Sequence, residues 1–147
     1  MTTASQITEW ADANHGKCID RDNRYGAQAP DLVNAYAQDL YDLPHVLGNG
    51  EDMAANLARV HGWEEIGPDE HAKLGDVFST SANATYSPYG FCGVVILDLG
   101  TKLVVFVQNV NGTGEDPASF QLISKAGITG YARPLTPDPA SATLAPS

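Results

Sequence analysis

Apolar residues in the first 61 positions recur three or four residues apart, the spacing that places them on one face of a helix. Thr3 and Gln6 have the spacing of a capping box, and Pro30 suits a first helical turn. The first helix is expected to end before Asn14 and the second at Leu43. The apolar stripes of the three predicted helices are Ile7, Trp10 and Ala11; Leu32, Val33, Tyr36 and Leu40; and Met53, Ala54, Leu57 and Val60.

After His61 the apolar period changes from about 3.6 residues to 2, which indicates strands. The runs Val94–Leu97 and Leu103–Val107 flank a Leu-Gly-Thr turn and are apolar at successive positions, as expected for the two central strands of a sheet. Helices first and strands second predict an α+β fold, with three helices packed on one side of a five- or six-stranded antiparallel sheet. The predicted strands are 76–80, 93–99, 102–109, 120–124 and 130–133.

The chain of 147 residues suits one domain, which we place at 1–134. Residues 135–147 contain mainly Pro, Ala, Ser and Thr and predict a flexible or extended arm. The formal net charge of −10 disfavours nucleic acid and anionic membranes as partners and favours a protein partner. The longest apolar run is interrupted by Asp98 and Lys102, and the N-terminus lacks a signal-peptide pattern, so no membrane span is expected.

The two cysteines, Cys18 and Cys92, are too few for a disulfide framework, and we interpret both as reduced and buried. Cys92 lies on a predicted strand and is expected to pack in the core. No pair among His15, His45, His61 and His71 has the spacing of metal ligands.

The segment Asp20–Tyr36, with Tyr25-Gly26-Ala27-Gln28 at its centre, resembles the cysteine, histidine-dependent amidohydrolase/peptidase (CHAP) family. Members of this family are papain-like peptidoglycan hydrolases. The resemblance continues over residues 10–134 through a series of landmarks, namely Gly48-Asn49, Gly75-Asp76, Tyr89-Gly90, Gly93, Gln108-Asn109, Gly130-Tyr131 and Arg133-Pro134. It implies a papain-like fold.

The resemblance also implies positions for a catalytic thiol, histidine and carboxylate. In this chain those positions hold Ala29, Phe91 and Val107, none of which can act as nucleophile or base. Of the polar residues that the resemblance implies for this site, Gln28 and Asn109 are present in this chain. The sequence therefore predicts a pseudoenzyme that has no catalytic residues.

Three carboxylates, Asp20, Asp22 and Asp31, match positions that bind calcium in some members of the family. Hard cations prefer several oxygen ligands, which such a loop can supply. In the alternative interpretation this is a surface turn in which Arg21 and Arg24 neutralise the acids. No other cofactor is expected.

Phe91 occupies the implied histidine position, and two further aromatic residues, Tyr86 and Tyr89, lie close before it in the sequence. They form either a docking groove where a reactive cleft would lie or the packed edge of the sheet.

Two functions follow from these expectations. The first is an inactive CHAP-like structural or binding module of a bacteriophage virion, a head decoration or tail protein whose partners are virion subunits or copies of itself. The alternative is a peptidoglycan hydrolase, an amidase or endopeptidase, or a cell-wall-binding domain, including an inactivated lysin domain. The location is the virion in the first case and otherwise the cytoplasm.

Overall fold

Three α-helices form where the apolar stripes predict them. The computed structural model describes residues 3–20, 28–81, 90–110 and 116–135. The helices are α1 (Ala4–Asn14), α2 (Ala29–Tyr41) and α3 (Met53–His61), and α3 is preceded by a 3-10 turn, η1 (Gly50–Asp52).

The helix ends follow local sequence chemistry. The capping box at the start of α1 is confirmed, because the Thr3 amide donates to Gln6 Oε1 at 2.7 Å and the Gln6 amide donates to Thr3 Oγ1 at 3.2 Å. The helix continues through Asn14, one residue further than expected. Helix α2 ends where Asp42 adopts a left-handed conformation with φ 54°. Val60, assigned to the apolar stripe of α3, is 51% exposed.

In the described part of the chain six strands form one antiparallel sheet, which confirms the α+β prediction. They are β1 (Glu64–Ile66), β2 (Val77–Thr80), β3 (Cys92–Asp98), β4 (Lys102–Val107), β5 (Ser119–Ser124) and β6 (Ile128–Arg133). Their order across the sheet is β1-β6-β2-β3-β4-β5. Strand β1 was not predicted, because three residues, two of them Glu, carry no period-2 pattern.

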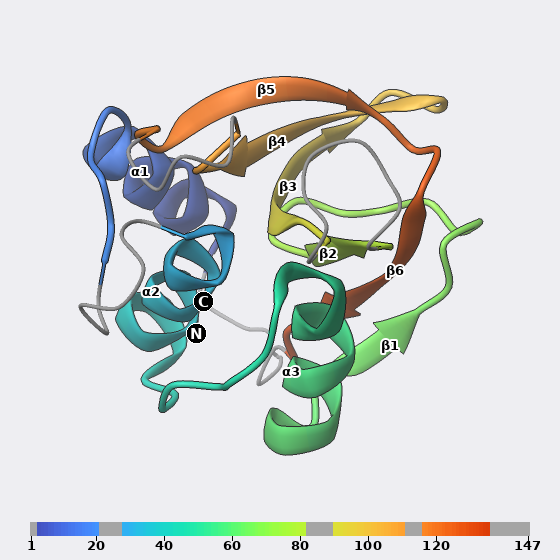
Figure 1. Ribbon diagram of the computed structural model, residues 1–147, viewed down its shortest axis with the longest axis horizontal. Coiled ribbons are helices and arrows are strands. Elements are labelled where there is room, and N and C mark those ends of the chain that lie inside the picture. The colour runs from blue at the N-terminus through green and yellow to red at the C-terminus, as the bar shows by residue number, and fades with distance from the viewer. Residues whose placement is uncertain (1–2, 21–27, 82–89, 111–115, 136–147) are drawn as a thin grey trace.

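The predicted central hairpin lies inside the sheet, where β3 pairs with β2 and β4 pairs with β5. The helices gather on one side of it (Figure 1). Phe106 of β4 contacts Trp10 of α1, with ring centroids 5.7 Å apart, and Ser79 of β2 accepts the Ala54 amide of α3. One sheet face is thus covered by helices from the first half of the chain.

An aromatic cluster joins α1, α2 and the sheet. Tyr36 is fully buried, its ring lies edge-on to Trp10 at 5.4 Å, and its hydroxyl donates to the Gly75 carbonyl at 2.8 Å. Burial raises the pKa of Tyr36 well above its ordinary value, so the hydroxyl stays protonated and keeps donating. This cluster fixes the direction in which α2 approaches the sheet.

None of the helices in the described ranges is long and apolar enough to cross a bilayer. The arm predicted at 135–147 lies outside the described residues from position 136 onward.

Candidate functional site

The site that the sequence analysis identified centres on the start of α2. Gln28 precedes the helix, Ala29 and Pro30 form its first turn, and the Asp31 carboxylate accepts the Gln28 amide at 3.1 Å. Pro30 is tolerated here because the first helical amides have no intrahelical acceptor. The local sequence therefore places Pro30 in the first turn of the helix, as predicted, and leaves Ala29 only 5% exposed.

A small cleft of about 50 Å³ lies against this helix start. It brings together Ala29 and Phe91, two of the three positions implied by the resemblance, although they are 62 residues apart in the chain. The side chains with hydrogen-bonding capacity on its wall are carboxamides. The cleft is lined by Gln28, Ala29, Pro30, Asn49, Gly50, Gly90, Phe91 and Asn109.

Two glycines allow the segment before α3 to lie close to the segment before β3. A Cβ atom on Gly50 would lie 2.7 Å from the Gly90 carbonyl oxygen, and a Cβ on Gly90, where φ is +78°, would lie 2.5 Å from the Glu51 amide nitrogen. Neither position has room for a side chain. This close approach explains why the landmark Tyr89-Gly90 contains glycine, and Gly50 and Gly90 both line the cleft.

Phe91 belongs to the hydrophobic core. Its side chain is 2% exposed and its ring lies 6.2 Å from that of Phe78. The backbone around it is fixed by Thr80, whose Oγ1 accepts the Phe91 amide at 2.9 Å and whose own amide donates to the Phe91 carbonyl at 2.8 Å. Of the two alternatives for these aromatic residues, a docking groove or the packed edge of the sheet, the second describes Phe91 better. Tyr86 and Tyr89 lie outside the described residues.

Val107 is not part of the cleft lining. It is fully buried and borders a separate cavity of about 30 Å³ together with Phe91, Val110, Gln121 and Ile123. The structure thus brings two of the three implied positions together at the cleft, and it places the third beside Phe91 only.

The two cysteines have different environments. Cys92 is fully buried, and burial together with the nearby Asp31 carboxylate raises the pKa of its thiol far above the ordinary value. It is a neutral core residue at physiological pH, as predicted. Cys18 is exposed, so the expectation that both cysteines are buried is wrong for Cys18. Residues 15–18, between α1 and the buried Ile19, are all exposed.

The calcium prediction rests on three aspartates, of which Asp22 lies outside the described residues. Asp20 Oδ1 is buried and has no hydrogen-bond partner among the residues that the structure describes, an arrangement that suits a bound cation. Asp31 uses one carboxylate oxygen for the Gln28 amide. Within the described ranges no three His, Cys, Asp or Glu side chains form a cation site, so calcium stays a prediction that the orphan oxygen of Asp20 supports.

Gln108 is a residue whose role the sequence analysis missed. It is fully buried; its Nε2 donates to the carbonyl oxygens of Ile19 and Gln28, both at 2.7 Å, and its Oε1 accepts the Ile19 amide at 3.0 Å. A single side chain at the end of β4 thus holds the chain on both sides of residues 21–27. The available signal was a glutamine directly after an apolar central strand, where a buried polar group needs partners.

Comparison with known proteins gives a likeness in structure alone. No protein-family profile and no curated protein matches the sequence. The wild-type endolysin LysIME-EF1 matches with a TM-score of 0.75 and 25% identity over 91% of this chain and 65% of that chain. Ly7917 matches with a TM-score of 0.69 and 16% identity over 90% and 63%, and Ly7917 solved with the hydrolysing product of MDP with 0.68 and 15% over 90% and 63%. The chain spans less than two thirds of the length of these structures.

These likenesses contradict the prediction that the chain is not an enzyme. That prediction rested on Ala29, Phe91 and Val107 alone, whereas a likeness covering 91% of the chain is to a wild-type endolysin. The side chains at these three positions are not the only groups near the cleft. Residues 21–27 and 82–89, which adjoin Gln28 and Gly90 in sequence, lie outside the described part of the chain. The absence of an acid or base at three positions is therefore insufficient ground for excluding an enzyme.

Proposed function

We propose that this domain acts on bacterial peptidoglycan as a hydrolase of the endolysin type, with the papain-like fold of the CHAP family. The observation that carries the proposal is the likeness to the endolysin LysIME-EF1 over 91% of the chain at 25% identity. The likeness to Ly7917 bound to the hydrolysing product of MDP, a peptidoglycan fragment, supports the same substrate class.

The chemistry of the cleft fits a peptide substrate. Gln28, Asn49 and Asn109 line it, and a carboxamide side chain carries both a donor and an acceptor, the same pair of groups that a peptide bond presents. Such side chains match the amide and carbonyl groups of an extended peptide. The peptide part of peptidoglycan, more than its sugar part, is therefore the group that we assign to the cleft.

Proton transfer and attack on the scissile bond require groups other than Ala29, Phe91 and Val107, because none of these three side chains ionises. The buried thiol of Cys92 is also excluded as the nucleophile by its raised pKa. A role as a virion component, expected from the sequence as the first function, is supported by none of the comparisons.

Digestion of purified cell walls tests the proposal. The protein is incubated with sacculi of several cell-wall types, and the released amino groups and soluble muropeptides are measured by amine labelling and mass spectrometry. We expect new amino groups to appear, and we expect Ala29→Leu, which fills the cleft, to abolish them. Ala58→Leu on α3, away from the cleft, is the matched control, and circular dichroism verifies that both variants fold.

The position of the new amino groups distinguishes an amidase from an endopeptidase. Binding of sacculi without the release of any amino group would overturn the hydrolase and leave a cell-wall-binding domain. Neither binding nor release with any wall type would overturn both.

A further inference from the structure

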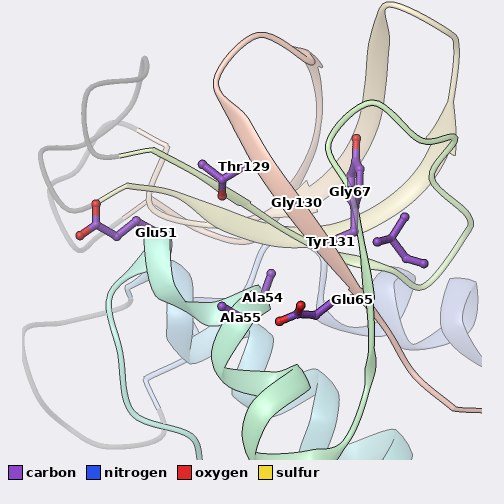
Figure 2. A pocket seen from close by; sticks show the side chains of 9 residues that line it. Glu51, Ala54, Ala55, Glu65, Gly67, Thr129, Gly130 and Tyr131 are labelled. Carbon is purple, nitrogen blue, oxygen red and sulfur yellow. The ribbon is translucent and has the colours of Figure 1, made fainter.

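A second hollow, larger than the cleft, lies between the start of α3 and the strands β1 and β6 (Figure 2). Its volume is about 340 Å³, enough for a side chain of several heavy atoms. We call it the α3 groove; it is lined by Glu51, Ala54, Ala55, Glu65, Ile66, Gly67, Thr129, Gly130 and Tyr131.

Small residues keep the α3 groove open. Ala54 and Ala55 form its helical wall, and Gly67 and Gly130 contribute no side chain on the strand side. Ala54 is fixed in place because its amide donates to the buried Ser79 Oγ at 2.9 Å. The hollow is thus open because the residues at these positions have short side chains or none. Its opening does not depend on a long side chain that points away from it.

The charged groups of the α3 groove are two carboxylates, Glu51 and Glu65, and its lining contains no Lys, Arg or His. Among the described residues neither carboxylate has an ion-pair or hydrogen-bond partner, in contrast with Asp76 and Asp98, which are both paired with a basic residue. Figure 2 shows the Glu65 carboxylate pointing across the groove toward Ala55. The Thr129 hydroxyl donates to the Ser79 carbonyl at 3.2 Å, which leaves its oxygen able to accept.

The α3 groove and the cleft share a wall. Gly50 lines the cleft and Glu51, the next residue, lines the groove. Gly90, also in the cleft, approaches Glu51 so closely that a Cβ there would lie 2.5 Å from the Glu51 Cβ. A peptide whose backbone lies in the cleft therefore has the groove beside it. A side chain of that peptide can extend from the cleft into the groove.

From these observations we infer that the α3 groove binds the side-chain ammonium group of a peptide whose backbone occupies the cleft. This inference rests on the proposed function and names the part of the substrate that the groove selects. Stem peptides of peptidoglycan carry a diamino acid, so such an ammonium group is present in the proposed substrate. The Glu65 carboxylate points across a hollow with no cation in its lining, and a carboxylate is the group that an ammonium ion requires.

The two carboxylates contribute unequally. Glu51 lies in η1 at the start of α3, where the positive end of the helix dipole already neutralises part of its charge. Glu65 lies on β1, four residues after the last residue of α3, and is not at the N-terminal end of a helix. Glu65 is therefore the residue that determines the preference for an ammonium group, and Glu51 reinforces it.

Two synthetic peptides test the inference. Both are stem tetrapeptides with an acetylated N-terminus; one has a free lysine side chain and the other is acetylated at the lysine Nζ, so that they differ in one charge. Isothermal titration calorimetry measures the binding of each to the wild-type protein, to Glu65→Gln and to Glu64→Gln. Glu64 neighbours Glu65 on the same strand but lies outside the groove, so its variant loses the same charge and serves as the matched control.

We expect the wild-type protein to prefer the free lysine peptide by about 5- to 10-fold, the range of one charge-assisted hydrogen bond at a partly exposed site. Glu65→Gln loses this preference and Glu64→Gln keeps it. Equal binding of both peptides by the wild-type protein, or equal loss in both variants, overturns the inference and leaves the proposed function standing. Binding of neither peptide, together with no action on sacculi, overturns the proposed function and the inference with it.

Discussion

Gln108 forms with Ile19 the pair of hydrogen bonds that a strand residue forms with its neighbour. Its Oε1 accepts the Ile19 amide at 3.0 Å and its Nε2 donates to the Ile19 carbonyl at 2.7 Å, across 89 residues of sequence. The same Nε2 donates to Gln28, one residue before Ala29. The position of the cleft relative to the sheet thus depends on a side chain that is itself outside the cleft.

Replacement of Gln108 by leucine is expected to destabilise the fold. It leaves the buried amide and carbonyl of Ile19 without partners, which costs about 2 to 6 kcal/mol of unfolding free energy at about 1 to 3 kcal/mol for each orphaned group. Urea denaturation measures the change. Gln38→Leu, at an exposed position of α2, is the control. If Gln108→Leu lowered the free energy of unfolding by less than about 0.5 kcal/mol, as an ordinary surface substitution does, this role of Gln108 would be contradicted.

The thiols are expected to react at two different rates. Cys18 is exposed and reacts with a thiol reagent in the folded protein, whereas Cys92 is buried and has a raised pKa, so it reacts only on unfolding. Titration with a chromogenic disulfide should count one fast thiol per native chain and a second in denaturant. Two fast thiols in the native protein would show that Cys92 is accessible, in conflict with its place in the core.

Asp98 is expected to make stability depend on pH in the acid range. Its burial raises the pKa, but hydrogen bonds from Lys125 at 2.6 Å and from the amides of Gly100 and Ala72 outweigh burial and lower the pKa to about 2. A carboxyl whose pKa is lower in the folded state stabilises the protein above its unfolded pKa of 3.8, and this contribution is lost as the pH falls from about 4 to 2.

Asp98→Asn should therefore cost about 1 to 3 kcal/mol at pH 7, and the difference from the wild-type protein should shrink below pH 4. Thermal unfolding from pH 7 to pH 3 measures it, with Asp69→Asn, at an exposed position between β1 and β2, as control. A difference that stays constant over this range would show that the Asp98 charge does not stabilise the fold.

Calcium is expected to stabilise the protein through Asp20. With a dissociation constant near 0.1 mM, 1 mM calcium would add about 1.4 kcal/mol and raise the melting temperature. Asp20→Asn should remove this shift, while Asp12→Asn, on the exposed side of α1, should retain it. A melting temperature that does not change up to 5 mM calcium, about fifty times that constant, would contradict the site.

Action on cell walls is expected to depend on salt. The chain carries a formal net charge of −10, and anionic cell walls repel it. Raising the ionic strength from 0.01 to 0.15 M shortens the screening length from about 30 Å to about 8 Å, so the initial rate of amine release should rise. A rate that falls steadily with salt would mean that a local basic surface governs the approach to the wall.

Much of the architecture was predictable because it follows from periodicity. Amphipathic stripes gave three helices, the runs around Val95 and Val105 gave the central strands, and Thr3 with Gln6 gave a cap, since each of these depends on residues near in sequence. Strand β1 was missed because Glu64 and Glu65 form an edge whose pairing with β6 is decided by distant residues.

The sequence by itself determined the fold class, the place of Pro30 in the first turn of α2 and the core position of Cys92, because local propensity and apolar patterning are sufficient for these. Only the tertiary structure decided that Ala29 and Phe91 share a cleft while Val107 does not, and that Gly50 and Gly90 join this cleft to the α3 groove. Both depend on side chains and backbone meeting across 40 to 90 residues, and such contacts are fixed by packing of the whole domain.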